Sequence, residues 1–122
     1  MTFLRVMVKG KEYKAYQEAS GEPWLGYVLL PYGMYYEKTR VLLDASAGDV
    51  LRFFNGPDVR IESVMLIPCD KMCNFLCKMK YGITWDIAYQ QWLRYARLEG
   101  HGKDILDKGK CILVIYNAKD KV

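Results

Sequence analysis

The feature that most constrains the fold is a predicted β-hairpin over residues 47–67. Two apolar, β-prone runs flank the tetrapeptide Asn55-Gly56-Pro57-Asp58, and this turn chemistry between two such runs is typical of a hairpin. The far end of the second run is apolar on both faces. We therefore predict that its strand lies in the middle of a sheet.

Short strands are predicted before this hairpin. Alternating side chains indicate a strand over residues 3–8 that ends at a turn, and further strands are expected over residues 24–30 and 34–43. Residues 12–19 fit a helix and a strand equally well, and both alternatives stay open. The segment before the hairpin is thus predicted to be mostly β-structure.

Two helices are predicted after the hairpin. The first begins at Asp70, a good N-cap residue, and ends at Tyr81 and Gly82. Its expected apolar stripe comprises Met72, Cys73, Leu76, Cys77 and Met79.

The second helix begins at Thr84 and is terminated by the glycines around His101. Asp86 in its first turn and Arg94 and Arg97 in its last turns suit the helix dipole. One side is expected to be lined by Trp85, Ala88, Trp92 and Tyr95.

An apolar run over residues 110–116 predicts a buried last strand, followed by a frayed tail over residues 118–122. A chain of 122 residues without a composition break predicts one domain, residues 1–122. The order of elements predicts an α+β fold, in which a small and mostly antiparallel sheet or barrel carries two flanking helices between the hairpin and the last strand.

The net charge of +4 permits an anionic partner such as RNA without requiring one. Residues 69–98 carry five basic against two acidic side chains, so an electropositive face is expected on the helices. Because no apolar run is long enough to span a bilayer and the first residues lack a signal-peptide layout, we expect a cytoplasmic protein without a membrane partner.

Three cysteines, Cys69, Cys73 and Cys77, recur every fourth residue along one helix stripe. A metal-ligand set is conceivable, but the spacing is not CxxC and no histidine is near. We therefore predict buried free thiols in a reducing compartment and no metal site. The lone His101 is expected to be an exposed loop residue, and no cofactor motif is present.

Aromatic and basic residues alternate between Tyr35 and Arg40. Tyr35 and Tyr36 lie beside Lys38 and Arg40, so this strand offers stacking faces next to cations, the chemistry that binds unpaired bases and their phosphates. In the alternative, the tyrosines cover a sheet face with their hydroxyl groups in water.

The same region supplies residue types for proton or acyl transfer. Lys38, Thr39 and Glu62 could form such a set if the lysine pKa were depressed or the threonine had an adjacent base. Solvated surface charge is the alternative for these side chains.

The motif GDVLRF at residues 48–53, preceded by KTR at residues 38–40 and followed by a strand, two helices and an apolar strand, resembles the ASCH family of the PUA-like superfold. The likeness covers about residues 36–117. It implies a small β-barrel with a cleft between barrel and helices and a role in RNA or modified-nucleoside handling. Some members hydrolyse acetylated cytidine with a Lys, a Thr and a Glu, and Lys38 and Thr39 match that Lys-Thr segment. In an alternative registration, the family's lysine segment corresponds to residues 9–12, with Lys11.

Three functional hypotheses follow. The first is an RNA- or nucleotide-binding domain whose cleft is lined by Tyr35, Tyr36, Lys38, Arg40 and Arg52. The second is a small amidohydrolase of a modified nucleoside that uses Lys38, Thr39 and Glu62. The third is a module that binds another protein through exposed aromatic side chains.

Overall fold

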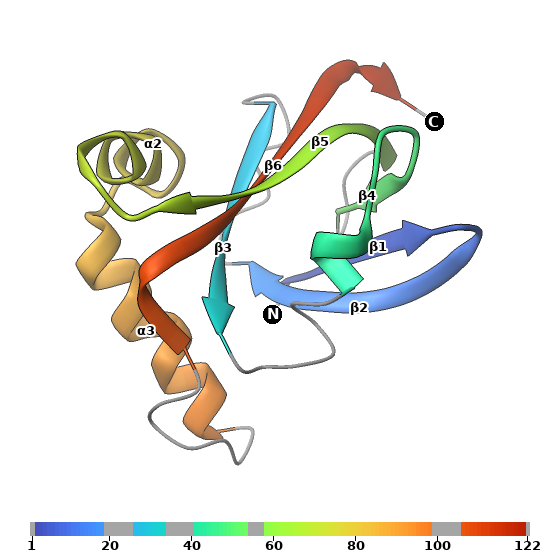
Figure 1. The fold of residues 1–122 in the computed structure, drawn as a ribbon. Coiled ribbons are helices and arrows are strands. Elements are labelled where there is room, and N and C mark those ends of the chain that lie inside the picture. The colour runs from blue at the N-terminus through green and yellow to red at the C-terminus, as the bar shows by residue number, and fades with distance from the viewer. Residues whose placement is uncertain (1, 19–25, 34–40, 54–57, 99–105, 122) are drawn as a thin grey trace.

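A computed structural model describes residues 2–18, 26–33, 41–53, 58–98 and 106–121 (Figure 1). These residues form a small α+β protein with a six-stranded sheet in the order β2-β1-β4-β5-β6-β3, in which every pair of neighbours is antiparallel. The strands are β1 (Thr2–Val8), β2 (Lys11–Glu18), β3 (Tyr27–Gly33), β4 (Val50–Arg52), β5 (Asp58–Pro68) and β6 (Leu106–Lys121). The α+β class is confirmed. Among the described residues β2 and β3 form the two edges of the sheet, so closure into a barrel stays a prediction.

The predicted hairpin is present as β4 paired with β5, and β5 lies in the middle of the sheet between β4 and β6. Its first strand, β4, is short and contains only three residues. The turn itself lies outside the described residues.

The first predicted strand is β1, and Lys9 and Gly10, both with positive φ, form the tight turn into β2. Of the two alternatives for residues 12–19 the strand is therefore correct as far as Glu18, and residue 19 lies outside the described residues.

Residues 41–44 form a helical turn, so the predicted strand over residues 34–43 is wrong at its end. The Ala45 N–H donates to the Leu42 carbonyl over 3.2 Å, and both side chains are buried. A helical turn brings side chains three residues apart to one side, where these two pack into the core.

Side chains of β3 and β6 alternate between two cores. Val28 and Leu30 belong to a cluster enclosed by the curved sheet, whereas Tyr27 and Leu29 belong to a cluster beneath the helices. In β6, Ile112 and its neighbours alternate in the same way. The predicted buried last strand is confirmed. The predicted frayed tail is wrong, because β6 continues to Lys121, which pairs with Val59 on β5.

The helices α2 (Lys71–Tyr81) and α3 (Trp85–Leu98) connect β5 to β6 and pack against β3, β6 and the end of β5 (Figure 1). Asp70 is the N-cap of α2, since its carboxylate accepts hydrogen bonds from the N–H groups of Met72 and Cys73. Thr84 accepts from the Ile87 N–H at the start of α3. Both predicted helix starts are therefore confirmed.

The buried stripe of α2 differs from the predicted one. Cys73, Cys77 and Lys80 face the core and Leu76 is half-buried, while Met72 and Met79 are exposed. The buried residues recur at i, i+4 and i+7, so they form one continuous line along the helix.

On α3, Trp85 and Ala88 are buried and Trp92 packs against the helix-side core, as expected, whereas the Tyr95 side chain lies outside the described set. No helix in the described part of the chain is long and apolar enough to cross a membrane.

Replacing Asp70 with Ala is expected to lower the free energy of unfolding by about 1 kcal/mol, because two N–H groups at the start of α2 lose their acceptor. Urea unfolding followed by circular dichroism measures the change. Asp70→Asn keeps an acceptor oxygen and should retain most of the stability. Equal losses in the two variants would contradict a capping role.

Candidate nucleic-acid interface

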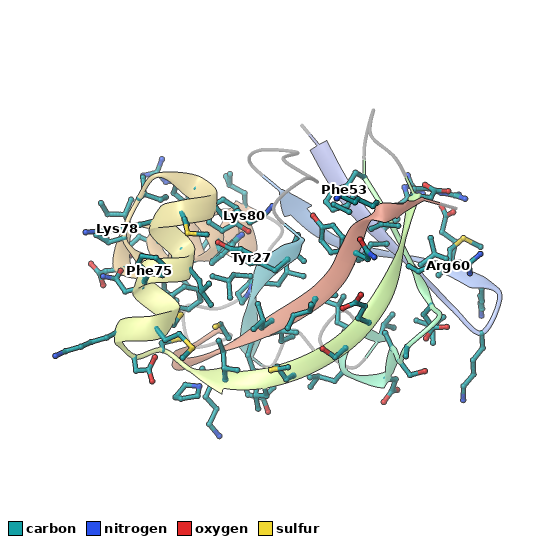
Figure 2. All side chains as sticks on the ribbon, turned by 90° about the horizontal axis from the view of Figure 1, so that it is seen from above. Tyr27, Phe53, Arg60, Phe75, Lys78 and Lys80 are labelled. Carbon is teal, nitrogen blue, oxygen red and sulfur yellow. The ribbon has the colours of Figure 1, made fainter. Side chains whose placement is uncertain are left out.

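Most of the ligand-binding residues predicted from the sequence lie outside the described residues. This holds for Tyr35, Tyr36, Lys38 and Arg40, and also for Thr39 of the predicted catalytic set. Arg52 and Glu62 are described, on β4 and β5 respectively. Figures 1 and 2 both place β4 on the side of the sheet away from α2.

Arg52 is held by carboxylates from two other strands. Its Nε and Nη2 donate to Asp58 over 3.1 to 3.2 Å, and its Nη1 donates to Glu12. Glu12 also accepts from Arg5 Nη1 over 3.0 Å, so this carboxylate bridges two arginines that are opposite each other on β1 and β4. The bridge offsets the repulsion expected between like charges at such a pair.

These contacts fix the guanidinium of Arg52 without using all its donors. The hydrogen bond to Asp58 and the charges of Asp58 and Glu12 raise the pKa of Arg52 above its ordinary value. A guanidinium carries five N–H groups. The contacts that the structure describes leave one hydrogen on Nη1 and one on Nη2.

Glu62 is exposed on β5 and is not brought to Arg52. It lies four residues beyond Asp58, the cross-strand partner of Arg52, and thus about 13 Å further along the strand. Arg52 and Glu62 therefore do not share one compact site. How either is placed relative to Lys38 lies outside the described residues.

The outer surface of α2 carries apolar and basic side chains that the sequence reasoning did not combine. Phe75 is 62% exposed, and Met72 and Met79 are 66% and 50% exposed. Lys71 and Lys78 are also exposed and lie four residues before and three residues after Phe75, which makes them its neighbours on the helix surface. Figure 2 shows Phe75 and Lys78 directed away from the sheet. The spacing alone places these residues on one side of α2, but that this side faces solvent follows from the packing of the helix.

The inner surface of α2 is joined to β3 by two tyrosines. Tyr27 on β3 donates its hydroxyl to the Leu76 carbonyl, and Tyr81 donates to the Leu29 carbonyl, each over 2.7 Å. Burial raises the pKa of Tyr27, and the nearby Cys77 contributes. Lys80 is only 3% exposed, and its ammonium lies 5.7 Å from the centre of the Tyr81 ring. These contacts fix which face of α2 is turned outward.

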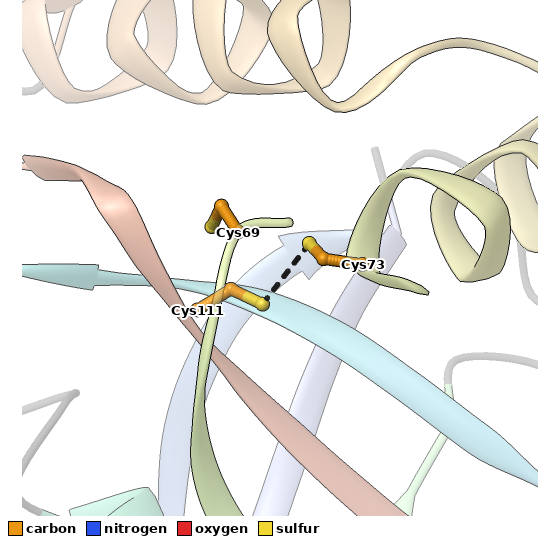
Figure 3. A group of neighbouring side chains, drawn as sticks. All are labelled: Cys69, Cys73 and Cys111. Carbon is orange, nitrogen blue, oxygen red and sulfur yellow. Dashed lines mark hydrogen bonds between the residues drawn. The ribbon is translucent and has the colours of Figure 1, made fainter. Parts of the chain in front are cut away.

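Three thiols meet where β5 ends, α2 begins and β6 passes beneath them (Figure 3). The Sγ atoms of Cys69, Cys73 and Cys111 lie within 4.8 Å of one another, and those of Cys73 and Cys111 are 3.4 Å apart. Hydrogen bonds with Cys111 and Cys69 lower the pKa of Cys73, whereas hydrogen bonds with Cys69 and Cys73 raise the pKa of Cys111. Cys73 and Cys77 are buried free thiols as predicted, whereas Cys69 is half-exposed.

Burial raises the pKa of Cys77 to about 12, with a further contribution from Cys73. A thiol in the unfolded chain ionises near pH 8.5. Between pH 8.5 and 12 the unfolded state binds fewer protons than the folded state. The free energy of unfolding therefore falls as pH rises, by up to about 1.4 kcal/mol per pH unit.

Cys77→Ser should remove this contribution, because serine does not ionise in the range. We expect a constant stability difference from wild type between pH 6 and 8 and a narrowing difference above about pH 9. Urea unfolding across this pH range measures it. If the free energies of unfolding of wild type and Cys77→Ser differed by the same amount at every pH up to about 12, the raised pKa of Cys77 would be contradicted.

Comparison of the chain with protein-family models, with characterised proteins and with solved structures found no match.

Proposed function

We propose that this protein binds RNA or a nucleotide and that the outer surface of α2 is a binding surface. The observation that carries the proposal is the exposed ring of Phe75 between Lys71 and Lys78. It is the same combination of an aromatic face and neighbouring cations that the sequence predicts for residues 35–40. On α2 this combination lies on a regular helix within the described residues.

The exposed ring suits an unpaired base. Full burial of a Phe or Met side chain is worth about 1.5–3 kcal/mol, so three such side chains left open on one helix face favour a partner that covers them. A base has a flat apolar face of the size of the Phe75 ring. Stacking of one base on an aromatic side chain contributes about 1–3 kcal/mol.

The charge of the helix suits phosphate. Within α2 three lysines and no acidic residue are present, and Lys71 and Lys78 are the two exposed ones. Arg94 and Arg97 on α3 are exposed as well. A strand whose base stacks on Phe75 would have its phosphates within reach of ammonium groups on either side.

A protein partner is the second candidate, and the exposure of Met72 and Met79 favours it. Flexible Met side chains adapt to varied apolar surfaces. We argue for RNA because the cations lie on both sides of the aromatic ring, whereas an apolar protein surface would leave them without a complementary charge. The amidohydrolase alternative depends on Lys38 and Thr39, which lie outside the described residues.

The finer fold assignment is also a proposal. The hairpin of β4 and β5, two helices and a long last strand follow one another in the order expected for an ASCH-type, PUA-like domain. The curved sheet encloses a core of its own, which supports a barrel-like arrangement. Four free cysteines support the cytoplasm as the compartment, since thiols persist where the environment is reducing.

Fluorescence anisotropy with a panel of short single-stranded RNAs at two salt concentrations tests the proposal. Wild type should bind more weakly at high salt, and Phe75→Ala should lose about 5- to 150-fold in affinity, as expected for one lost stacking contact. Lys71→Gln and Lys78→Gln should each reduce the slope of log K against log salt by about 0.7.

Ile87→Ala is the matched control, because Ile87 is an exposed apolar residue on the neighbouring helix α3. Its affinity should equal that of wild type. Absence of RNA binding at low salt, or equal affinities of Phe75→Ala and wild type, would overturn the assignment. In that case, loss of a protein partner on Phe75→Ala substitution would support the interaction module instead.

A further inference from the structure

We propose that Cys69, Cys73 and Cys111 form a binding site for a single thiophilic d¹⁰ metal ion, Zn²⁺ or Cu⁺. Thiolate sulfur is the ligand that both ions prefer. The three residues come from different parts of the fold, namely the connection just after β5, the first turn of α2 and the interior of β6 (Figure 3). The site is independent of the proposed RNA-binding surface.

The sulfur positions fit the size of such an ion. Tetrahedral bonds of 2.3 Å to zinc separate two sulfurs by about 3.8 Å, and a trigonal arrangement separates them by about 4.0 Å. The Cys73–Cys111 separation of 3.4 Å is slightly below this span, and no separation in the cluster exceeds 4.8 Å. Shifts of about 1 Å or less would therefore bring the sulfurs to bonding positions.

The backbone around each ligand is fixed without a metal. The Cys69 N–H donates to the Gly109 carbonyl over 2.9 Å, and the Cys73 N–H donates to Asp70 over 3.2 Å. Cys111 lies within β6 and pairs with β3 on one side and β5 on the other. Ligands on such rigid elements lose little conformational freedom when an ion binds.

The surroundings of Cys73 favour its anionic form, and Cys69 gives the cluster a path to solvent. Cys73 lies in the first turn of α2, where the backbone dipole stabilises negative charge. Cys73 and Cys111 are fully buried, while Cys69 is half-exposed and connects the cluster to solvent. Zinc would complete its shell with a water molecule from the side of Cys69, whereas three thiolates complete the trigonal shell of Cu⁺.

The binding step needs no oxidant or reductant. Each S–H bond breaks with loss of its proton to solvent, and the sulfur electron pair forms the metal–sulfur bond. Binding of one ion by three thiols releases up to three protons and changes the oxidation state of neither metal nor sulfur.

Anaerobic titration of the reduced full chain tests the site. In one arm Zn²⁺ is titrated against a chromophoric chelator, and in the other Cu⁺ is titrated against a Cu⁺-specific chelator. We expect one ion per chain in at least one arm, and the arm that succeeds identifies the metal. Failure of both arms would overturn the proposal.

Cys73→Ser and Cys111→Ser should weaken metal binding at least 10- to 100-fold, the loss that even an outer-shell substitution can cause. Cys77→Ser is the matched control, because Cys77 is a buried cysteine one helical turn from Cys73 but outside the cluster. It should bind within about threefold of wild type, well below the 10-fold loss expected for a ligand.

Cys69→Ser alters a half-exposed position and keeps the test decisive if the buried variants do not fold. It should weaken binding at least 10-fold while leaving the circular dichroism spectrum unchanged. Wild-type affinity in Cys69→Ser, or an equal loss in Cys77→Ser, would overturn the assignment of the three ligands.

Discussion

The burial of β3 and β6 on both faces is the constraint on which the rest of the structure depends. Successive side chains of a strand point to opposite sides, so a strand between two cores must be apolar at nearly every position. β6 meets this requirement with Cys111, Ile112, Leu113 and Val114 in sequence. The sheet can therefore enclose one core and support the helices on the other.

The hairpin, both helices and the last strand could be predicted because their signals are local. A Gly-Pro turn, an Asp70 cap and a run of apolar residues each act within a few positions. The helical turn of residues 41–44 and the length of β6 depend on distant partners, namely the core that receives Leu42 and the strand that pairs with Lys121. Secondary-structure propensity over a short stretch of sequence does not predict such long-range contacts.

The candidate sites also combine features that are local in the sequence with contacts between distant residues. The sequence showed Cys69 and Cys73 one helical turn apart, but Cys111 is 38 residues from Cys73 and joins it only through the register of β6. The predicted apolar stripe of α2 contained Met72 and Met79, because periodicity counts apolar residues without showing which line meets the sheet. The orientation of α2 is decided by contacts to β3 and β6, and these are tertiary.

That orientation links the thiol cluster to the proposed binding surface. Cys73 and Phe75 are two residues apart, so they point to nearly opposite sides of α2. Turning the helix to bury Phe75 with Met72 and Met79 would remove Cys73 from Cys111. This rotation would also break the hydrogen bond from the Tyr81 hydroxyl to the Leu29 carbonyl. The thiol contact and the tyrosine hydrogen bonds therefore favour the observed side of α2 against the sheet, and in this orientation the Phe75 ring lies in solvent.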